Sequence, residues 1–360
     1  MQRLNEIKEK IKRIDHSLEK ETQRRLDNLT KPQGSLGRLE ELAMRMVGIT
    51  GNALPPVKDK VIFILAGDHG VAEEGVSAYP KEVTPQMVYN FIRGGAGINV
   101  LARHVGARVV IADMGIACDL EPHPDLIIKK VNYGTRNMAK GPAMTREEAI
   151  KSIENGMEIF EKEFEKGIDI AGIGDMGIGN TTPSSAITSA ITGESVDRTT
   201  GRGTGIDDKA VSNKIALIKK AISLNKPDPE DAIDVLSKVG GFEIGGLTGI
   251  ILAAASKKVP IVIDGFISGA AALLACELAP NVKDYMIAAH CSQEKGHKII
   301  LDYLALSPLL DLNLRLGEGT GAALGISIVE ASIKILTEMA TFKSASVSQK
   351  ADKQRELIRP

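Results

Sequence analysis

A glycine-rich stretch in the middle of the chain has the residue types of an anion-binding loop. A short apolar run, 168–173, leads into four glycines within eight positions, 172–179. Asn180 and Pro183 follow, as they do where a helix begins, because a polar residue caps the first turn and proline fits inside it. Glycine lets backbone N–H groups close on a ligand, and the helix dipole favours negative charge there. The stretch therefore predicts a phosphate site between a strand and a helix.

Two other interpretations of this stretch stay open. The spacing Gly172-x-Gly174-x-x-Gly177 matches the fingerprint of a dinucleotide site, with Glu194 about where the ribose-binding acid would stand, and would make the protein a nicotinamide-dependent oxidoreductase. The polar residues after Gly177 weaken this match, because the fingerprint continues into an apolar helix. The other interpretation is a tight strand-to-helix crossover without a ligand.

A second candidate for chemistry is Glu318, which stands between Gly317 and Gly319 just before an apolar helix, 322–336. The glycines give this carboxylate little side-chain cover and let a substrate approach it closely. Apolar neighbours such as Leu316 would desolvate it and raise its pKa, as a general base requires. The alternative is that Glu318 caps the following helix and interacts with its dipole.

Two further sets of polar residues follow glycine-rich or apolar runs. Lys209 and Lys214 come after the turn at 201–205, and a lysine there can hold a phosphate as a point charge. Because they are five positions apart on a helix, at most one of them faces the site. Asp68 and His69 end an apolar strand, where α/β proteins bind ligands, but one Asp-His pair is too small for a metal site. Ordering of a loop is the alternative role of this pair.

Strand-like and helix-like runs alternate along the chain, which predicts an α/β fold with a mainly parallel sheet. The predicted strands are 61–66, 109–114, 168–173, 259–264 and 286–290.

The two ends of the chain look different from its middle. Apolar residues at three- and four-residue spacing predict an amphipathic helix over residues 1–30, and Ser35 is placed to cap a second helix that reaches Thr50. A long connection, 119–142, is predicted to be irregular, and 341–360 has the polar composition of a disordered tail.

The composition fits a globular protein that works on small molecules. The chain has 360 residues, 43% hydrophobic and 25% charged, and a net charge of -1 gives no sign of a nucleic-acid or membrane partner. The three cysteines, Cys118, Cys276 and Cys291, lack zinc or disulfide spacing, which is typical of reduced thiols in the cytoplasm. The charged N-terminus lacks the apolar core of a signal peptide, and no apolar run reaches membrane length. We expect a cytoplasmic protein without a bound metal.

Eight ordered motifs give the chain a more specific resemblance, over about residues 29–335. It resembles the nicotinate-nucleotide–dimethylbenzimidazole phosphoribosyltransferases, which make the lower-ligand nucleotide of cobalamin. The motifs are LTKPQGSLGRLE (29–40), AGDHGV (66–71), GVSAYPKEVT (75–84), GGAGINVLAR (94–103), GIGDMGIGNTT (172–182), GRGTGIDD (201–208), IDGFISGAAALLA (263–275) and LRLGEGTGAALG (314–325).

The resemblance implies a Rossmann-like, mainly parallel sheet flanked by helices, with a small helical domain formed from both chain ends. Residues 1–50 would contribute helices to the small domain, 51–325 would form the α/β catalytic domain, and 326–360 would complete the small domain. It also implies a homodimer.

The resemblance further implies a reaction. The phosphoribosyl group of nicotinate mononucleotide passes to 5,6-dimethylbenzimidazole with inversion at C1′, giving α-ribazole 5′-phosphate and nicotinate. Glu318 matches the family's general base, and Asp175 stands where the family usually has glutamate. No metal or other cofactor is expected, because departure of nicotinate neutralises its cationic ring nitrogen. The remaining matched positions bind the mononucleotide or the base: Gly177, Gly179, Asn180, Thr181, Gly203, Lys214, Ser77, Gln86 and Leu316.

Overall fold

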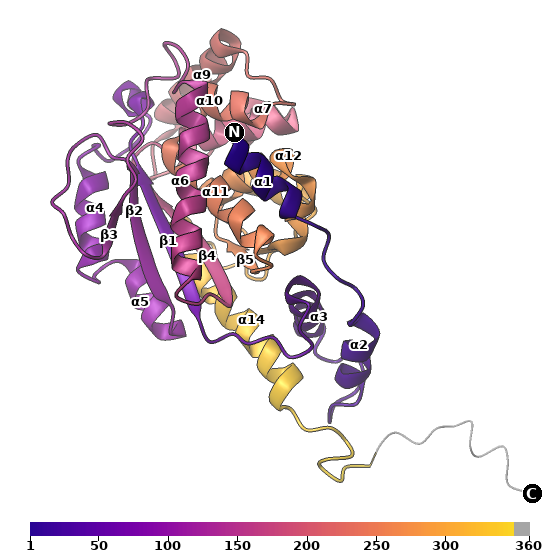
Figure 1. The fold of residues 1–360 in the computed structure, drawn as a ribbon. Helices are drawn as coiled ribbons and strands as arrows, with labels where there is room; N and C mark the ends of the chain where they lie inside the picture. The colour runs from indigo at the N-terminus through magenta and orange to yellow at the C-terminus, as the bar shows by residue number, and fades with distance from the viewer. Residues whose placement is uncertain (349–360) are drawn as a thin grey trace, which may run out of the picture. The chain divides into compact units, whose positions relative to one another are not determined.

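Six parallel strands form the central sheet of the computed structural model, which describes residues 1–348 (Figure 1). Their order is β3-β2-β1-β4-β5-β6, so the direction of winding reverses between β1 and β4. In sheets of this kind, ligands bind outside the carboxyl ends of the strands at that reversal. The strands are β1 (Lys60–Gly67), β2 (Arg108–Gly115), β3 (Leu126–Ile128), β4 (Ile170–Met176), β5 (Ile261–Ile263) and β6 (Met286–Ala288).

The central strand β1 is apolar because helices cover it on both sides. Its residues from Val61 to Ala66 are fully buried, and β-branched side chains suit such a strand. Ala66 lies opposite Asp113 of β2 and Met176 of β4, so the three strands end at the same edge of the sheet. The sequence prediction of a mainly parallel sheet is confirmed.

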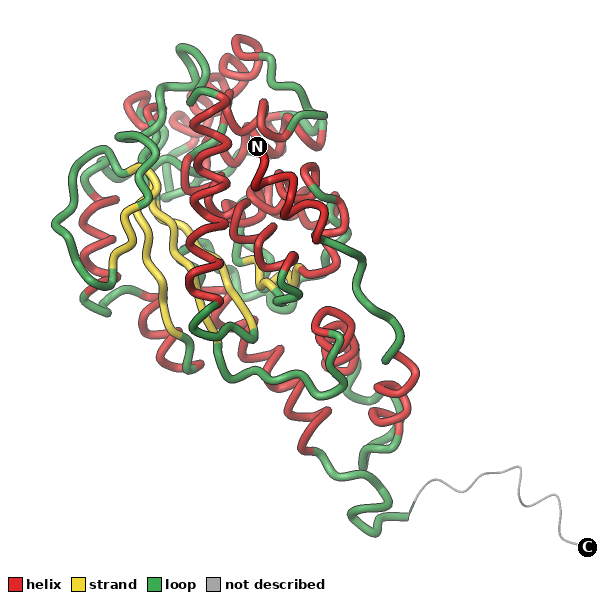
Figure 2. Tube along the Cα trace, viewed as in Figure 1, coloured by secondary structure: helices red, strands yellow, loops and turns green. Residues whose placement is uncertain are grey.

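Helices lie on both faces of this sheet (Figures 1 and 2). Two helices pack on one face, α11 (Phe242–Ser256) and α12 (Phe266–Leu278), and α6 (Arg146–Phe164) packs against α11. On the other side of the strands lie α4 (Val83–Ile92) and α5 (Gly97–Val105). The remaining elements of the large unit are α1 (Gln2–Lys10), α7 (Thr181–Thr192), α8 (Val196–Thr199), α9 (Asp208–Asn225), α10 (Ala232–Val239), α13 (Lys295–Tyr303) and the 3₁₀ turns η1 (Gly70–Glu74) and η2 (Pro280–Tyr285).

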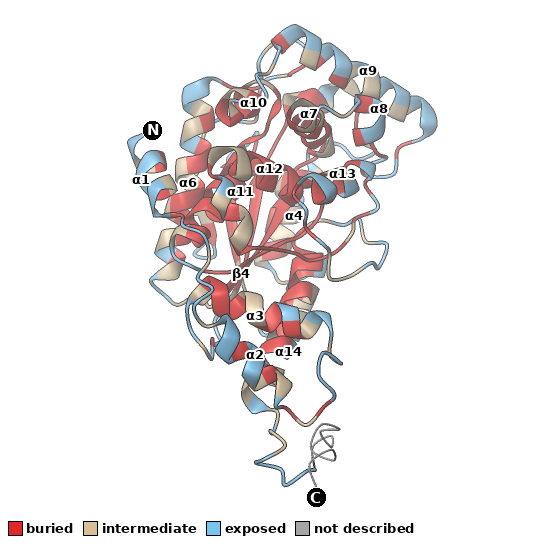
Figure 3. Ribbon diagram, turned by 90° about the vertical axis from the view of Figure 1, so that its right-hand side faces the viewer, coloured by how far each residue is buried: buried red, intermediate tan, exposed pale blue. Residues whose placement is uncertain are grey.

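The core is centred on the sheet and on α11 and α12, which Figure 3 shows as buried. Residues 242–255 of α11 are all buried. The last helix, α14 (Thr320–Glu338), packs Ala322 and Ile326 against Gly172 of β4. Among the described residues, α14 is the one helix with the length and composition to cross a membrane, and 56% of its most apolar stretch is buried within the protein. A core helix has the same features.

The chain divides into two compact units. The larger comprises Met1–Arg13 and Val57–Ser327, and the smaller comprises Ile14–Pro56 and the chain from Ile328 onward. Within the smaller unit, α2 (Glu19–Asp27) is tied to the end of α14 because Arg25 donates to the carbonyl of Thr337. The smaller unit therefore joins segments from both ends of the sequence. The predicted domain limits at residues 50 and 325 remain a prediction.

Two predictions about the N-terminal helices were wrong. Residues 1–30 do not form one helix, because the backbone turns extended at Ile11 and the next helix, α2, begins at Glu19. Leu4 and Ile7 are buried in the larger unit, whereas Ile14 lies against Gly48 in the smaller unit, so separate packing overrides the continuous apolar pattern. The helix predicted from Ser35 begins later, as α3 (Arg38–Thr50), after Gly37.

The connection at 119–142 is not wholly irregular either. It contains β3, which pairs with Ile111–Asp113 at the edge of the sheet. A strand of three residues is too short to show an alternating pattern. The predicted tail lies partly outside the described residues, which end at 348.

Candidate active site

The candidate site begins where β1 and β4 end side by side. Gly177 follows β4, and a Cβ built on it would lie 2.3 Å from the carbonyl oxygen of Gly67, so only glycine allows this approach. Behind the turn, His69 Nε2 lies 2.8 Å from Glu243 Oε1 at the start of α11, and both side chains are buried. Burial alone would lower the pKa of His69, but the neighbouring Glu243 carboxylate raises it. The pair lies directly behind the turn, because a Cβ on Gly177 would lie 3.2 Å from His69 Nε2.

Glu318 reaches this edge of the sheet because β4 contains glycine at position 174. A Cβ on Gly174 would lie 2.2 Å from the backbone nitrogen of Gly319, so the loop packs directly on the strand. Glu318 itself has a left-handed backbone, with φ of +62°, and is 5% exposed. Such a conformation is costly for a side-chain-bearing residue, and it is found at active sites as well as in turns and at helix ends.

The surroundings of Glu318 suit a general base. Its Oε2 accepts a hydrogen bond from the backbone N–H of Ile98, 3.3 Å away, at the start of α5. Burial raises the pKa of Glu318, the Ile98 N–H opposes this, and the Asp264 carboxylate raises it further. Glu318 does not cap the following helix, which was the alternative role, because Asp264 accepts the N–H groups at the start of α14. Leu316 is 59% exposed, so it contributes less to this burial than its position in the sequence suggested.

Asp175 lies at the end of β4, beside the loop that carries Glu318. Its carboxylate accepts a hydrogen bond of 2.8 Å from Asn180 Nδ2, and Gly317 lies against it. Burial and the negative charge of Asp264 raise the pKa of Asp175 to about 8. Asn180 therefore orients Asp175 rather than capping α7, for which its side chain makes no hydrogen bond.

A second cluster forms at the start of α7. The Nζ atom of Lys214, a fully buried side chain on α9, donates to Thr181 Oγ1 at 2.6 Å. Burial lowers the pKa of Lys214 to about 8, against the effect of Glu294, whose Oε1 accepts the N–H of Gly203 at 2.8 Å. Lys209 is exposed, so one lysine of the two faces the site, as the spacing predicts.

The residues matched to a base pocket lie in different surroundings. Ser77 Oγ is 3.2 Å from Thr204 Oγ1, which joins its loop to the turn at 201–205. A Cβ on Gly97 would lie 3.0 Å from Leu316 and 3.5 Å from Glu318, so the start of α5 adjoins both residues. Gln86 is exposed on α4.

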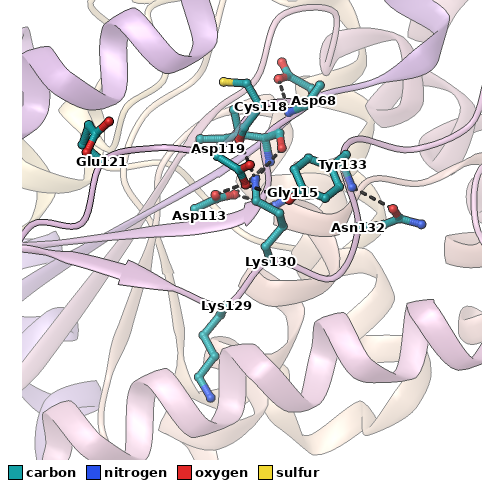
Figure 4. A network of polar contacts seen from close by, with 12 residues as sticks. Asp68, Asp113, Gly115, Cys118, Asp119, Glu121, Lys129, Lys130, Asn132 and Tyr133 are labelled. Carbon is teal, nitrogen blue, oxygen red and sulfur yellow. Dashed lines mark hydrogen bonds and ion pairs between the residues drawn. The ribbon is translucent and has the colours of Figure 1, made fainter.

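Asp68 orders the loops that follow β1 and β2, which was the alternative role for it (Figure 4). Its Oδ2 accepts the N–H of Ala117 at 2.9 Å. In the same network, Lys130 Nζ lies 2.8 Å from Asp113 Oδ2 and donates to the carbonyl of Cys118 at 3.0 Å. A pocket of about 420 Å³ adjoins these loops, lined by Asp68, His69, Gly70, Ala72, Glu73, Tyr79, Pro80, Lys81, Glu82, Ala117, Tyr133, Gly134 and Thr135.

The structure removes the basis for the dinucleotide interpretation. Gly172 and Gly174 lie inside β4, where they make room for α14 and its loop, and not in a turn that a pyrophosphate can reach. Glu194, the expected ribose-binding acid, forms an ion pair of 2.7 Å with Arg198. Within residues 1–348, no group of three or more His, Cys, Asp or Glu side chains is arranged to hold a metal ion.

Four buried polar residues of the site have no role predicted from the sequence: Glu243, Asp264, His290 and Glu294. Asp264 directly follows β5 and His290 comes shortly after β6, so their place at carboxyl ends of strands was the available signal. No comparable pattern marks Glu243 or Glu294.

Comparisons with known proteins agree with this geometry. A family model described as phosphoribosyltransferase matches residues 11–347. A nicotinate-nucleotide–dimethylbenzimidazole phosphoribosyltransferase of Geobacter sulfurreducens is 58% identical over 346 residues, covering 96% of this chain and 98% of the relative. One of Desulforudis audaxviator is 58% identical over 341 residues, covering 95% and 97%.

The solved structures point the same way. The crystal structure of CobT from Thermus thermophilus has 42% sequence identity and a TM-score of 0.89, and covers 92% of this chain and 99% of its own. Three observations point to one family. The strands wind outward from β1 and β4, a carboxylate base candidate lies at the ends of these strands, and the relatives are this similar over their full length. The chain belongs to the nicotinate-nucleotide–dimethylbenzimidazole phosphoribosyltransferase family.

Proposed function

We propose that this protein is the enzyme that transfers the phosphoribosyl group of nicotinate mononucleotide to 5,6-dimethylbenzimidazole. The products are α-ribazole 5′-phosphate and nicotinate, a step of cobalamin biosynthesis. The observation that carries the proposal is the buried carboxylate of Glu318, held at the carboxyl ends of β4 and β5 with a raised pKa.

In the proposed reaction, Glu318 takes the proton from one ring nitrogen of the benzimidazole. The other ring nitrogen attacks C1′ of the ribose from the face opposite nicotinate, and the bond from C1′ to the pyridinium nitrogen breaks. Its electron pair leaves with nicotinate, which neutralises that nitrogen. The anomeric centre inverts from β to α.

The remaining site residues would bind the two substrates. Gly177, Gly179, Asn180 and Thr181 would hold the mononucleotide, with its phosphate near Lys214, because that buried ammonium lies at the start of α7. Asp175 would orient the ribose or another part of the substrate. Gly203 would shape the second ligand loop, while Ser77, Gln86 and Leu316 would line the base pocket.

We also propose that the enzyme is a cytoplasmic homodimer, as the family resemblance implies. Analytical ultracentrifugation tests this state: a species of twice the chain mass at assay concentrations is expected. A monomer that is fully active would contradict the proposal.

The function is tested by incubating the protein with both substrates and measuring nicotinate release, in the parent and in Glu318→Gln. Glutamine keeps the shape but cannot accept the proton, so kcat should fall by about 10²–10⁴-fold, with less effect on mononucleotide binding. Glu194→Gln is the matched control, because this residue would matter only in a dinucleotide site. Near-parental turnover of Glu318→Gln would show that the base lies elsewhere.

A further inference from the structure

Asp264 lies beneath the loop that carries Glu318 and has no exposed surface. Its Oδ2 accepts the N–H of Gly319 at 3.2 Å, and its Oδ1 accepts the N–H of Ala322 at 2.8 Å. These N–H groups belong to the residue after Glu318 and to the first turn of α14. Asp264 therefore fixes the backbone immediately after the strained Glu318, from a rigid position at the end of β5.

The imidazole ring of His290 lies next to the carboxylate of Asp264. His290 Nε2 lies 4.0 Å from Asp264 Oδ1, and His290 is 2% exposed. A Cβ on Gly321 would lie 2.1 Å from the His290 ring and 2.8 Å from Asp264 Oδ1, so α14 meets the pair through a glycine. His297 lies next to His290. Burial, and to a smaller extent the charge of His290, lowers the pKa of His297 to about 3, so His297 stays neutral.

The charged groups around Glu318 come from several elements. Asp175 lies at the end of β4, Asp264 after β5, and His290 after β6, while Glu243 at the start of α11 acts on Asp175. Burial raises the pKa of Asp264 to about 6, but His290 and the backbone N–H groups favour its charged form. A charged Asp264 raises the pKa of Glu318 and of Asp175.

We propose that Asp264, with His290 behind it, is a positioning residue that holds Glu318 in its left-handed conformation and acts on its carboxylate through charge. This inference rests on the proposed function. Asp264 touches neither reacting atom: it acts by fixing the loop through two hydrogen bonds and by placing a negative charge near the base.

The test is the pH dependence of kcat/KM for Asp264→Asn, measured with the same benzimidazole as the parent so that the base's own titration cancels. Removing the negative charge of Asp264 lowers the pKa of Glu318. The acid limb, which is the loss of kcat/KM on the acid side of the pH profile, should therefore move to lower pH by on the order of one unit. Loosening the loop should also lower kcat by roughly 10- to 100-fold. His290→Gln should move the limb in the same direction, because Asp264 then keeps its proton to higher pH.

Asp231→Asn is the control, since Asp231 also accepts two backbone N–H groups at the start of a helix, both on its Oδ1 and away from the site. It should lower the melting temperature and leave the limb in place. The inference is overturned if folded Asp264→Asn has its acid limb at the same pH as the parent. It is also overturned if Asp231→Asn shifts the acid limb as far as Asp264→Asn does. If Asp264→Asn does not fold, His290→Gln decides in the same way. A parent chain without turnover would instead refute the proposed function.

Discussion

Glu318 and Asp175 are two carboxylates whose surroundings give them different roles. Both are buried near Asp264, yet Asp175 has its pKa raised to about 8 and a hydrogen bond from Asn180, whereas Glu318 accepts the N–H of Ile98 at the start of a helix. Two carboxyl groups whose surroundings give them different pKa values can take different roles in catalysis, one as a proton acceptor and one as a neutral acid. Glu318 suits proton acceptance, and Asp175 suits binding as a neutral acid at neutral pH.

The raised pKa of Asp175 makes a prediction about stability. In the unfolded chain Asp175 ionises near its ordinary value of 3.8, but in the folded protein it keeps its proton to about pH 8. Unfolding then releases a proton between these values, so this group's contribution to the free energy of unfolding falls as pH rises through that window. Asp175→Asn should lack this loss, so its melting temperature should rise relative to that of the parent as the pH increases from about 4 to about 8. Thermal denaturation checks this, with the exposed Asp302→Asn as control. Parallel curves would show that Asp175 is already ionised.

The loop that carries Glu318 depends on strand β4 as much as on its own sequence. Gly174 gives it a surface without side chains, Asp264 holds its far end, and the hydroxyl of Thr320 donates to the carbonyl of Gly317 at 2.9 Å. Three elements distant in sequence therefore fix one side chain. This makes the site sensitive to small changes in the strand below it.

Gly174→Ala tests that dependence. The added Cβ would lie 2.2 Å from Gly319 N and 2.3 Å from Glu318 C, so the loop must move away from β4. We expect kcat to fall by about 100-fold, the cost of misplacing a catalytic group by roughly 1 Å. Gly141→Ala is the control, because a Cβ there meets nothing within 4 Å. Steady-state kinetics with a measured melting temperature separate lost activity from lost stability, and parental kcat would contradict the account.

The sheet and the glycine-rich turn between β4 and α7 could be predicted from the sequence, because apolar runs and glycine spacing are local signals. β1 and β2 each lie within one residue of their predicted positions at both ends. Contacts between residues that are distant in the sequence could not be predicted. Asp264 became part of the site only through the pairing of β4 with β5, and the break between α1 and α2 reflects packing in two separate units.

The whole molecule is expected to work without a divalent ion. The leaving group carries its own positive charge, and residues 1–348 contain no cluster of three metal-binding side chains. Turnover should therefore be unchanged after dialysis against a chelator, as nicotinate release in metal-free buffer would show. Activity that is lost and then restored by magnesium would contradict this expectation.

The left-handed backbone of Glu318 opens a route to chemical rescue. At φ of +62° glycine is the residue that the backbone prefers, so Glu318→Gly should relieve strain while it empties a buried space the size of a carboxylate side chain. Formate or acetate could then enter that space and accept the benzimidazole proton in place of the missing group. We expect an inactive variant whose nicotinate release rises with formate concentration, while Glu318→Gln, in which the space stays filled, does not respond.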